Sequence, residues 1–273
     1  MAEALSLARS LKPYVALTGA RFRVLLQYRA AALAGFGTPL FWGLIRVMIF
    51  EAFFRSTTAS QPMDYPQTVT YLWLIQAMLL LVPWSIDGEL RAMIRSGGVA
   101  YELLRPADLY WFWYSRAVAG RVAPVLLRCT PMFVVAGLFF GLQPPASSAS
   151  AAAWLLATVG AVLLSCAITN LLAISLLWTI AGDGVMRLLS LFSMLLSGSI
   201  VPLPFFPEWS QPILAALPFR GLIDTPFRLY LGHIPPEGAP AVILHQVAWT
   251  TVLVLLGRWL LGCGTRRMVI QGG

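Results

Sequence analysis

A charged connector interrupts an otherwise apolar sequence. It runs from Asp87 to Tyr114, between two apolar segments of membrane length. Its charged residues include Arg91, Arg95, Glu102, Arg105 and Asp108. Two glycines, Gly97 and Gly98, precede a short amphipathic piece from Val99 to Leu104, which Pro106 ends. Apolar side chains rimmed by charge suit docking of a soluble partner at a membrane surface better than they suit catalysis.

Residues for ATP hydrolysis or proteolysis are missing. A phosphate-binding P-loop needs a lysine, and the only lysine, Lys12, lies outside any such pattern. An intramembrane serine protease would use Ser197 and His245, but Leu195 stands where its G-x-S-G motif begins. We therefore expect no enzymatic activity, and energised transport would draw its energy from a separate protein.

Cysteine chemistry is not expected either. Cys129, Cys166 and Cys263 lie within or beside apolar segments, too few and too scattered for a disulfide framework or a metal site. A buried free cysteine behaves as a small apolar residue. The sequence predicts no metal and no cofactor bound by this chain.

Polar residues inside the apolar segments are candidates for a substrate path. Arg46 and Asn170 are the two we name, since an ionisable or strongly polar group at membrane depth is costly. The alternatives are that Arg46 reaches Glu51, and that Asn170 only bonds helix to helix. Ser193 and Ser197 are four residues apart and predict a face for close helix packing or dimerisation.

Composition predicts an all-α membrane protein. The chain is 59% hydrophobic and 11% charged, with a mean hydropathy of +0.77. About 20 apolar residues cross the hydrocarbon, and in lipid such segments must be helices because their backbone groups need internal partners. The six predicted spans are Ala31–Phe54, Val69–Ile86, Arg121–Leu142, Ala152–Ile180, Leu188–Leu203 and Ile243–Gly262.

Arginines set the expected orientation. They are most frequent before the first span, between the second and third, and after the sixth, which places both termini and the connector in the cytoplasm. The net charge of +8 follows largely from this bias, so no nucleic-acid partner is needed to explain it. Attraction to anionic lipid headgroups is compatible with the same residues.

We expect one transmembrane domain over residues 1–273 with three further features. Residues 1–30 read as a cytoplasmic interfacial helix that Pro13 opens. Asp108 caps a third helix longer than the membrane needs, running to Leu142. The proline-rich region 204–242 is too broken to span and is expected to form an extracellular re-entrant helical hairpin.

Two short motifs in the connector resemble those of a transporter family. These are Ile94-Arg95-Ser96-Gly97-Gly98 and Leu103-Leu104-Arg105-Pro106. Leu217-Pro218-Phe219, with Pro226 shortly after, fits the same group. Together with six spans and a basic amino-terminal helix, they resemble the membrane subunit of ABC-2 type ABC transporters, in the subfamily often encoded as two permeases plus one ATPase.

The resemblance implies a half-transporter in the bacterial plasma membrane. Such subunits pair with an identical or sister permease and bind cytoplasmic ABC ATPase subunits, which carry the ATP and magnesium. It implies that residues 96–106 form the ATPase-docking element. The expected docking residues are Val99, Tyr101, Leu103 and Leu104 at the centre, with Arg95, Glu102 and Arg105 at the rim and Ser96, Gly97, Gly98 and Pro106 shaping the turn.

Cargo and mechanism leave alternatives. The scarcity of charge within the spans favours an amphiphilic or lipid-like substrate, and family precedent points to drug, antibiotic or lipid export. A secondary transporter is the rival function, although the sequence shows neither its inverted repeats nor many ionisable residues for coupling. A non-transporting membrane assembly subunit is the other alternative.

Overall fold

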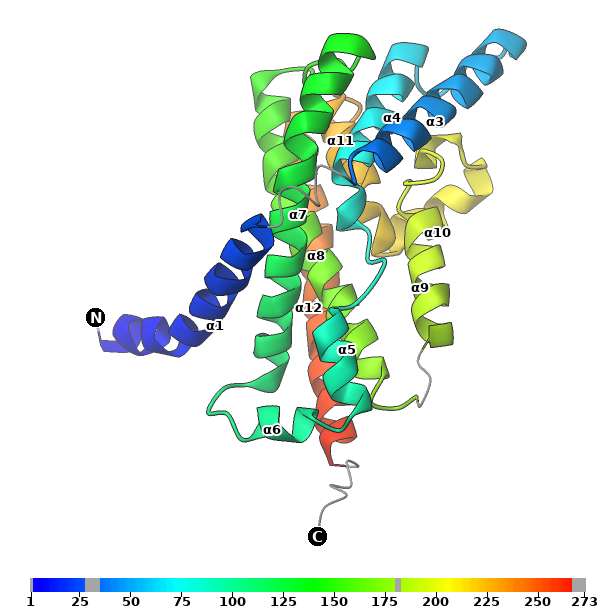
Figure 1. The fold of residues 1–273 in the computed structure, drawn as a ribbon. Helices are drawn as coiled ribbons and strands as arrows, with labels where there is room; N and C mark the ends of the chain where they lie inside the picture. The colour runs from blue at the N-terminus through cyan, green and yellow to red at the C-terminus, as the bar shows by residue number, and fades with distance from the viewer. Residues whose placement is uncertain (1, 28–34, 180–182, 267–273) are drawn as a thin grey trace.

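The computed structural model describes residues 2–27, 35–179 and 183–266. Every regular element within these ranges is helical, which confirms the predicted all-α class. The α-helices labelled in Figure 1 are α1 (Ala2–Gln27), α3 (Gly37–Ser56), α4 (Tyr65–Met78), α5 (Gly88–Arg95), α6 (Val99–Leu103), α7 (Leu109–Phe139), α8 (Ser148–Ser175), α9 (Asp183–Leu196), α10 (Gln211–Ala216), α11 (Asp224–Tyr230) and α12 (Ala239–Thr265). Short 3-10 turns are η1 (Leu79–Leu81), η2 (Leu203–Phe205), η3 (Glu208–Ser210), η4 (Phe219–Gly221) and η5 (Pro236–Gly238).

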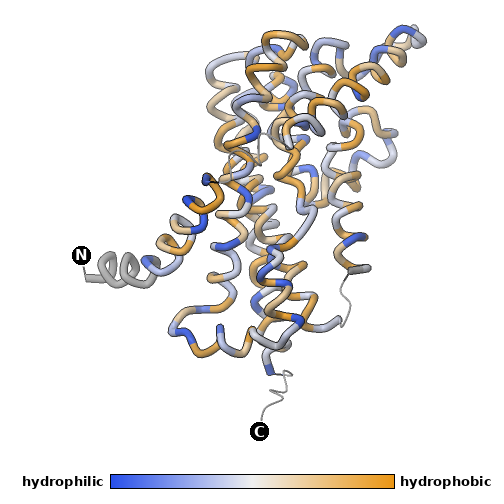
Figure 2. Tube along the Cα trace, viewed as in Figure 1, coloured by the Kyte–Doolittle hydropathy of each residue, from blue (hydrophilic) through white to orange (hydrophobic). Residues whose placement is uncertain are grey.

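Four helices in the described ranges are long and apolar enough to cross a membrane. They are α3, α7, α8 and the segment Pro236–Thr265, which contains α12. Figure 2 shows hydrophobic residues predominating along these helices, as a lipid-facing surface requires. They correspond to the first, third, fourth and sixth predicted spans, and residues 31–34 of the first prediction lie outside the described residues.

The predicted second span, Val69–Ile86, is not one continuous helix. Helix α4 has 14 residues and is followed by η1 and then by extended backbone at Val82. All residues from Thr68 to Met78 are buried inside the bundle, against α3 and α7 among others. A helix that is apolar on every side is buried in a protein core or in a membrane, and the 14 residues of α4 are too few to cross a membrane alone.

Close packing fixes α4 against α3. A Cβ atom added at Gly43 of α3 would lie 2.9 Å from Cη2 of Trp73, so only glycine lets the two helices approach this closely. The start of α4 is a capping box, in which the side chain of Asp64 accepts from Gln67 N at 2.7 Å and Gln67 Oε1 accepts from Asp64 N at 3.1 Å.

The fifth predicted span, Leu188–Leu203, also falls short. Helix α9 has 14 residues and ends at Leu196. Gly198 has a φ of +86°, a backbone conformation that terminates helices and favours glycine. The remainder of the predicted span therefore turns back towards η2 instead of continuing as helix.

The third predicted helix is confirmed in its unusual length. Helix α7 has 31 residues, and the carboxylate of Asp108 caps it by accepting from Trp111 N at 3.1 Å. Helix α8 lies beside it at the centre of the molecule, where it contacts α7, α11 and α12 (Figure 1). The connector, with α5 and α6, therefore joins the core helix α4 to the base of α7.

The amino-terminal helix begins earlier than the sequence indicated. Pro13 lies inside α1 and does not open it. The second half of α1 packs on α7, where Tyr14 Oη accepts from Asp108 N at 2.9 Å, while its first half leaves the bundle (Figure 1). In the 204–242 region, α10 and α11 have six and seven residues, so the expected short helices are present.

Candidate functional site

The connector, residues 87–114, folds as two short helices set against the base of α7. Gly97 adopts a φ of +74° between α5 and α6, a conformation that residues with a Cβ rarely adopt. Gly98 has an ordinary helical φ of −61°. The turn predicted from the double glycine therefore depends on Gly97, which redirects the chain so that α6 lies across the lower end of the bundle (Figure 1).

Helix α6 exposes apolar side chains on one face. Tyr101 and Leu104 are 77% and 81% exposed, and Leu103 is 45% exposed. Arg95, Ser96, Gly97, Arg105 and Pro106 are also exposed. Tyr101 and Leu104 are three positions apart and therefore lie on the same face of the helix, with the half-exposed Leu103 at its flank.

The opposite face of α6 is buried within the chain. Val99 is fully buried and Glu102 is 4% exposed. Glu102 Oε2 accepts from Trp113 Nε1 at 2.7 Å, and its Oε1 lies 3.9 Å from Nη1 of Arg116. Val99 and Glu102, expected in the docking centre and at its rim, are therefore turned inward in the single chain. Glu102 thereby anchors α6 to α7.

Other connector residues support the turn. Ser96 Oγ donates to the carbonyl of Met93 at 3.3 Å and accepts from Gly98 N at 3.4 Å. The guanidinium of Arg105 lies 5.0 Å from the ring centre of Phe112, which is a cation–π distance. Arg105 thereby ties the end of α6 to the start of α7.

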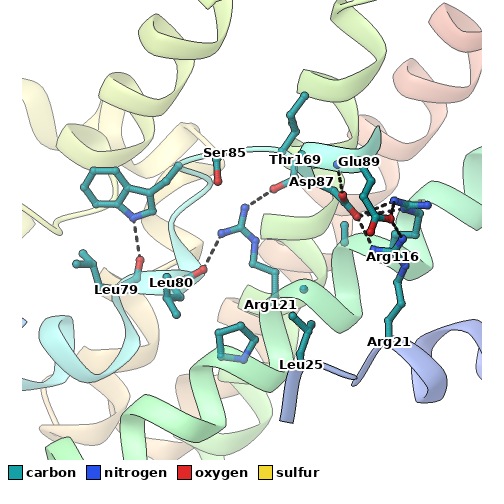
Figure 3. A pocket seen from close by; sticks show the side chains of 16 residues that line it. Arg21, Leu25, Leu79, Leu80, Ser85, Asp87, Glu89, Arg116, Arg121 and Thr169 are labelled. Carbon is teal, nitrogen blue, oxygen red and sulfur yellow. Dashed lines mark hydrogen bonds and ion pairs between the residues drawn. The ribbon is translucent and has the colours of Figure 1, made fainter. Parts of the chain in front are cut away.

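An ion-pair cluster joins the connector to two other helices. We call Arg21, Asp87, Glu89 and Arg116 the connector cluster (Figure 3). Arg116 of α7 donates to Asp87 Oδ2 at 3.0 and 3.2 Å and to Glu89 Oε2 at 3.0 Å. Arg21 of α1 donates to Asp87 Oδ2 at 2.7 Å and also binds Glu89. Because Arg116 also approaches Glu102, one guanidinium links α5, α6 and α7.

Both carboxylates of the connector cluster have lowered pKa values. Burial alone would raise the pKa of Asp87, but the charges of Arg116 and Arg21 outweigh burial and lower it. The hydrogen bond and charge of Arg21 lower the pKa of Glu89. Asp87 Oδ1 also caps α5, accepting from Glu89 N at 2.9 Å. The cluster thus stabilises the fold while its carboxylates are ionised.

The 3-10 turn η1 and the non-helical backbone that follows it, residues 79–86, form what we call the α4 break. Its carbonyl groups are paired by side chains from other helices. Arg121 Nη1 donates to the carbonyls of Leu80 and Val82, each at 2.7 Å. Ser165 donates to Leu81 and Ser190 to Pro83. Non-helical backbone survives at membrane depth only where protein or a water-filled cavity covers it, and here these side chains supply the partners.

A cavity of about 630 Å³ opens beside the α4 break and the connector cluster. Figure 3 shows Arg121 reaching from α7 to Leu80 and Thr169, with Arg116 and Arg21 beside Asp87 and Glu89. The lining residues are Arg21, Leu25, Leu79, Leu80, Trp84, Ser85, Ile86, Asp87, Gly88, Glu89, Arg116, Ala117, Gly120, Arg121, Pro124 and Thr169. The site therefore combines an apolar wall with a charged one.

The two candidate substrate-path residues are occupied elsewhere. Arg46 Nη1 donates to the carbonyl of Ser199, which ties α3 to the segment after α9. Asn170 is 1% exposed and its Nδ2 donates to the carbonyl of Tyr110 at 3.3 Å. Neither residue lines the cavity, and both join neighbouring elements. Arg46 contacts Ser199 and not Glu51, whose partner is Arg55.

The expected dimer face is closed in the single chain. Ser193 and Ser197 have no exposed surface because they face into the bundle, and the carbonyl of Ser197 accepts from Asp224 N at 3.1 Å. The exposed face of α9 carries larger apolar side chains: Leu188, Leu191, Phe192 and Leu195. The small residues therefore serve packing within the chain.

Sequence reasoning missed the cavity and most of its charged wall. Arg116 and Arg121 were visible as arginines in the first half of a long apolar helix, where a charge near hydrocarbon requires partners. That requirement was the available signal. Among the described residues, no three histidine, cysteine or acidic side chains gather where they could hold a metal ion.

Compared with protein-family models, with curated proteins and with solved structures, the chain finds no match. The geometry of the connector and the cavity is therefore the basis for any functional conclusion.

Proposed function

We propose that this chain is the membrane subunit of an ATP-driven exporter of the ABC-2 type. The observation that carries the proposal is the two-sided character of α6. Tyr101 and Leu104 project from it into solvent, while Glu102 fastens its other side to Trp113 and Arg116. An apolar patch held on a rigid support resembles the centre of a protein interface.

The energy source in this proposal is a partner. No P-loop lysine is available in the sequence, so ATP and Mg²⁺ would bind to separate cytoplasmic ATPase subunits. Those subunits would contact residues 96–106 through Tyr101, Leu103 and Leu104, with Arg95 and Arg105 at the rim. The chain itself contributes no catalytic residue.

Coupling would pass through Arg116. A displacement of α6 moves Glu102, and Arg116 connects Glu102 to Asp87 and Glu89 beside the cavity. Arg21 of α1 also pairs with Asp87 and Glu89, which connects α1 to the same cluster. Four elements therefore share one set of ion pairs, which gives a physical route from a bound ATPase to the membrane-side cavity.

The proposed topology keeps six crossings with both termini in the cytoplasm of a bacterial inner membrane. Helix α4 extends about 21 Å at 1.5 Å per residue, so it needs the α4 break to complete a crossing. Bundle side chains already satisfy the break's carbonyls. A dimer with an identical or sister subunit would use α3 and the exposed apolar face of α9. Residues 204–242 would form the extracellular re-entrant cover.

One observation favours a second candidate, a secondary transporter. Discontinuous helices often mark the substrate site of such proteins, and α4 is discontinuous at Leu79. Transport by purified protein in vesicles separates the two. A secondary transporter would move substrate on an ion gradient alone, whereas the proposed exporter would require an ATPase and ATP.

The deciding experiment removes the patch without disturbing its support. The double variant Tyr101→Ala, Leu104→Ala should weaken binding of the ATPase more than tenfold, or reduce the stimulation of ATP hydrolysis more than tenfold. A matched control is Trp209→Ala, which removes an aromatic side chain that is 75% exposed far from the connector. Normal complex formation and normal stimulation in the double variant would refute the docking assignment.

A further inference from the structure

The cavity beside the α4 break is lined by charged side chains of both signs. Three arginines line it against two carboxylates, which leaves one positive charge among the lining residues. Asp87 and Glu89 each contact both Arg21 and Arg116, so the connector cluster is internally paired. Arg116 also approaches Glu102, which lies outside the lining, and Arg121 is the lining arginine that stands apart from these ion pairs.

Arg121 has no acidic partner. Within the described part of the chain its guanidinium contacts two backbone carbonyls and the hydroxyl of Thr169, and no carboxylate pairs with it. The residue is 8% exposed. A buried cation without a counter-ion is costly, and an anion that entered the cavity would offset that cost.

Most of the other side chains that line the cavity are apolar, with Ser85 and Thr169 as the polar exceptions. Leu25, Leu79, Leu80, Trp84 and Pro124 line it together with Gly120. Its volume of about 630 Å³ lies within the range of small-molecule sites. One side is formed by α1, the helix expected at the membrane surface. A ligand for this cavity therefore needs an anionic group and an apolar body.

We propose that this cavity binds an anionic amphiphile, with a phosphate or carboxylate headgroup near Arg121 and a hydrocarbon chain along Leu25, Leu79 and Pro124. Arginine is suited to such headgroups because its planar guanidinium presents several donors to two oxygens at once. As the substrate class of the exporter, the assignment rests on the proposed function. As a binding site, it stands on the cavity alone.

The test uses the purified full-length chain in phosphatidylcholine nanodiscs, without any ATPase. Calorimetric titration compares dodecyl phosphate, which is anionic, with dodecylphosphocholine, which has the same chain and no net charge. We expect dodecyl phosphate to bind at least tenfold more tightly. Non-specific partitioning into the disc is common to all variants, so only differences between variants report the site.

Two matched variants locate the site. Gly120→Leu places a larger side chain on the cavity wall, and a Cβ atom at this position meets nothing within 4 Å. Gly137→Leu is the control, because it makes the same change on α7 at an equally open position outside the cavity. We expect the first to weaken dodecyl phosphate binding at least tenfold and the second to leave it unchanged.

A charge series at Leu25 tests the electrostatic part without touching Arg121, which supports the backbone. Leu25→Lys, Leu25→Gln and Leu25→Glu should bind dodecyl phosphate in that order, about threefold apart at low salt. Dodecylphosphocholine should bind the three alike. The series keeps side-chain size similar, so a trend reports charge.

Three results would overturn the inference. They are equal affinity for the two dodecyl compounds, no effect of Gly120→Leu, and displacement of dodecyl phosphate by inorganic phosphate at equal concentration. Failure of the α6 variants to affect an ATPase would refute the exporter and leave this binding result intact. Loss of charge selectivity with intact ATPase coupling would refute only the present inference.

Discussion

Asp87 and Asp224 belong to two regions of the molecule that differ in how they pair and bury a carboxylate. Asp87 meets two arginines, with nitrogen–oxygen distances of 2.7 to 3.2 Å. Asp224 is 2% exposed, and its nearest cation, Nη1 of Arg228, lies 3.7 Å from Oδ2. Tyr71 Oη donates to Asp224 Oδ1 at 3.3 Å. The first carboxylate is well paired and the second is mainly desolvated.

Their pKa values differ accordingly. Arg116 and Arg21 lower the pKa of Asp87 although burial acts against them. Burial raises the pKa of Asp224 to about 6, and the charge of Arg228 reverses only part of that rise. The comparison shows that an acid beside an arginine is not automatically stabilising, because the result depends on how many donors reach it and how much water it loses.

The two regions also differ in how far their short helices bury their apolar side chains. Helix α11, which carries Asp224, buries Phe227, Leu229 and Tyr230 against the bundle. Helix α6, attached to the connector cluster through Glu102, leaves Tyr101 and Leu104 in solvent. We interpret the packing of α11 as complete within the chain. For α6, the proposed function makes the exposed side chains the surface that binds the ATPase.

The largest expected effect comes from removing the arginine that the connector cluster shares. Arg116→Met should lower the free energy of unfolding by about 3–5 kcal/mol, since it leaves the buried Glu102 without a close cation and leaves Asp87 with Arg21 alone. Chemical denaturation in detergent measures the loss. The control is Arg55→Met: Arg55 pairs with Glu51 but is 79% exposed, so its loss should cost less than about 1 kcal/mol. Equal losses would contradict the special role of Arg116.

Neutralising each aspartate should change stability in opposite directions. Asp224→Asn should raise the free energy of unfolding at pH 8 by about 1–3 kcal/mol, because the neutral side chain avoids the desolvation that raises the pKa of Asp224. Asp87→Asn should lower it by about 1–3 kcal/mol through weaker hydrogen bonds to arginine. Destabilisation by both changes would mean that Arg228 pairs with Asp224 more strongly than its distance indicates.

The pH dependence supplies a second check on Asp224. Its folded-state pKa of about 6 exceeds the ordinary 3.8, so the folded protein holds a proton that the unfolded chain has released between those values. Stability from this group therefore falls as pH rises from about 4 to 6 and is constant above. The stability difference between Asp224→Asn and wild type should grow over that interval. A difference that is independent of pH would show that Asp224 is ionised throughout.

Local signals in the sequence were enough to predict several elements. Gly97 and Pro106 bracket α6 because backbone conformation is decided by the residues themselves. Asp108 predicted the start of α7 because a helix cap is formed by its own first turn. Long apolar segments predicted α3, α7, α8 and α12, since length and hydropathy are sufficient for that class of helix.

Contacts between distant parts of the chain could not be predicted in the same way. An apolar run reads alike in a helix that spans a membrane alone and in a shorter helix packed inside a bundle, and the structure shows α4 as a buried helix of 14 residues. Arg121 bonds a carbonyl 41 residues earlier, and Arg21 bonds a carboxylate 66 residues later. Charge pattern shows that such groups need partners but not which partners they find. The burial of Val99 and Glu102 could not be predicted for the same reason.

The smallest expected effect separates the two carboxylates of the connector cluster. Glu89 is 72% exposed, whereas Asp87 is 24% exposed. Glu89→Gln should therefore lower the free energy of unfolding by less than about 1 kcal/mol, because water and salt screen an exposed pair. Raising the salt concentration from 0.1 M to 1 M shortens the screening length from about 10 Å to about 3 Å and should abolish the Glu89 effect. The loss caused by Asp87→Asn should persist at 1 M salt, since its pairs with Arg116 are mostly buried. If Glu89→Gln lowered the free energy of unfolding as much as Asp87→Asn does, and equally at both salt concentrations, the exposed Glu89 would stabilise the cluster as much as the half-buried Asp87. Burial could then not explain the difference between the ion-paired Asp87 and the desolvated Asp224.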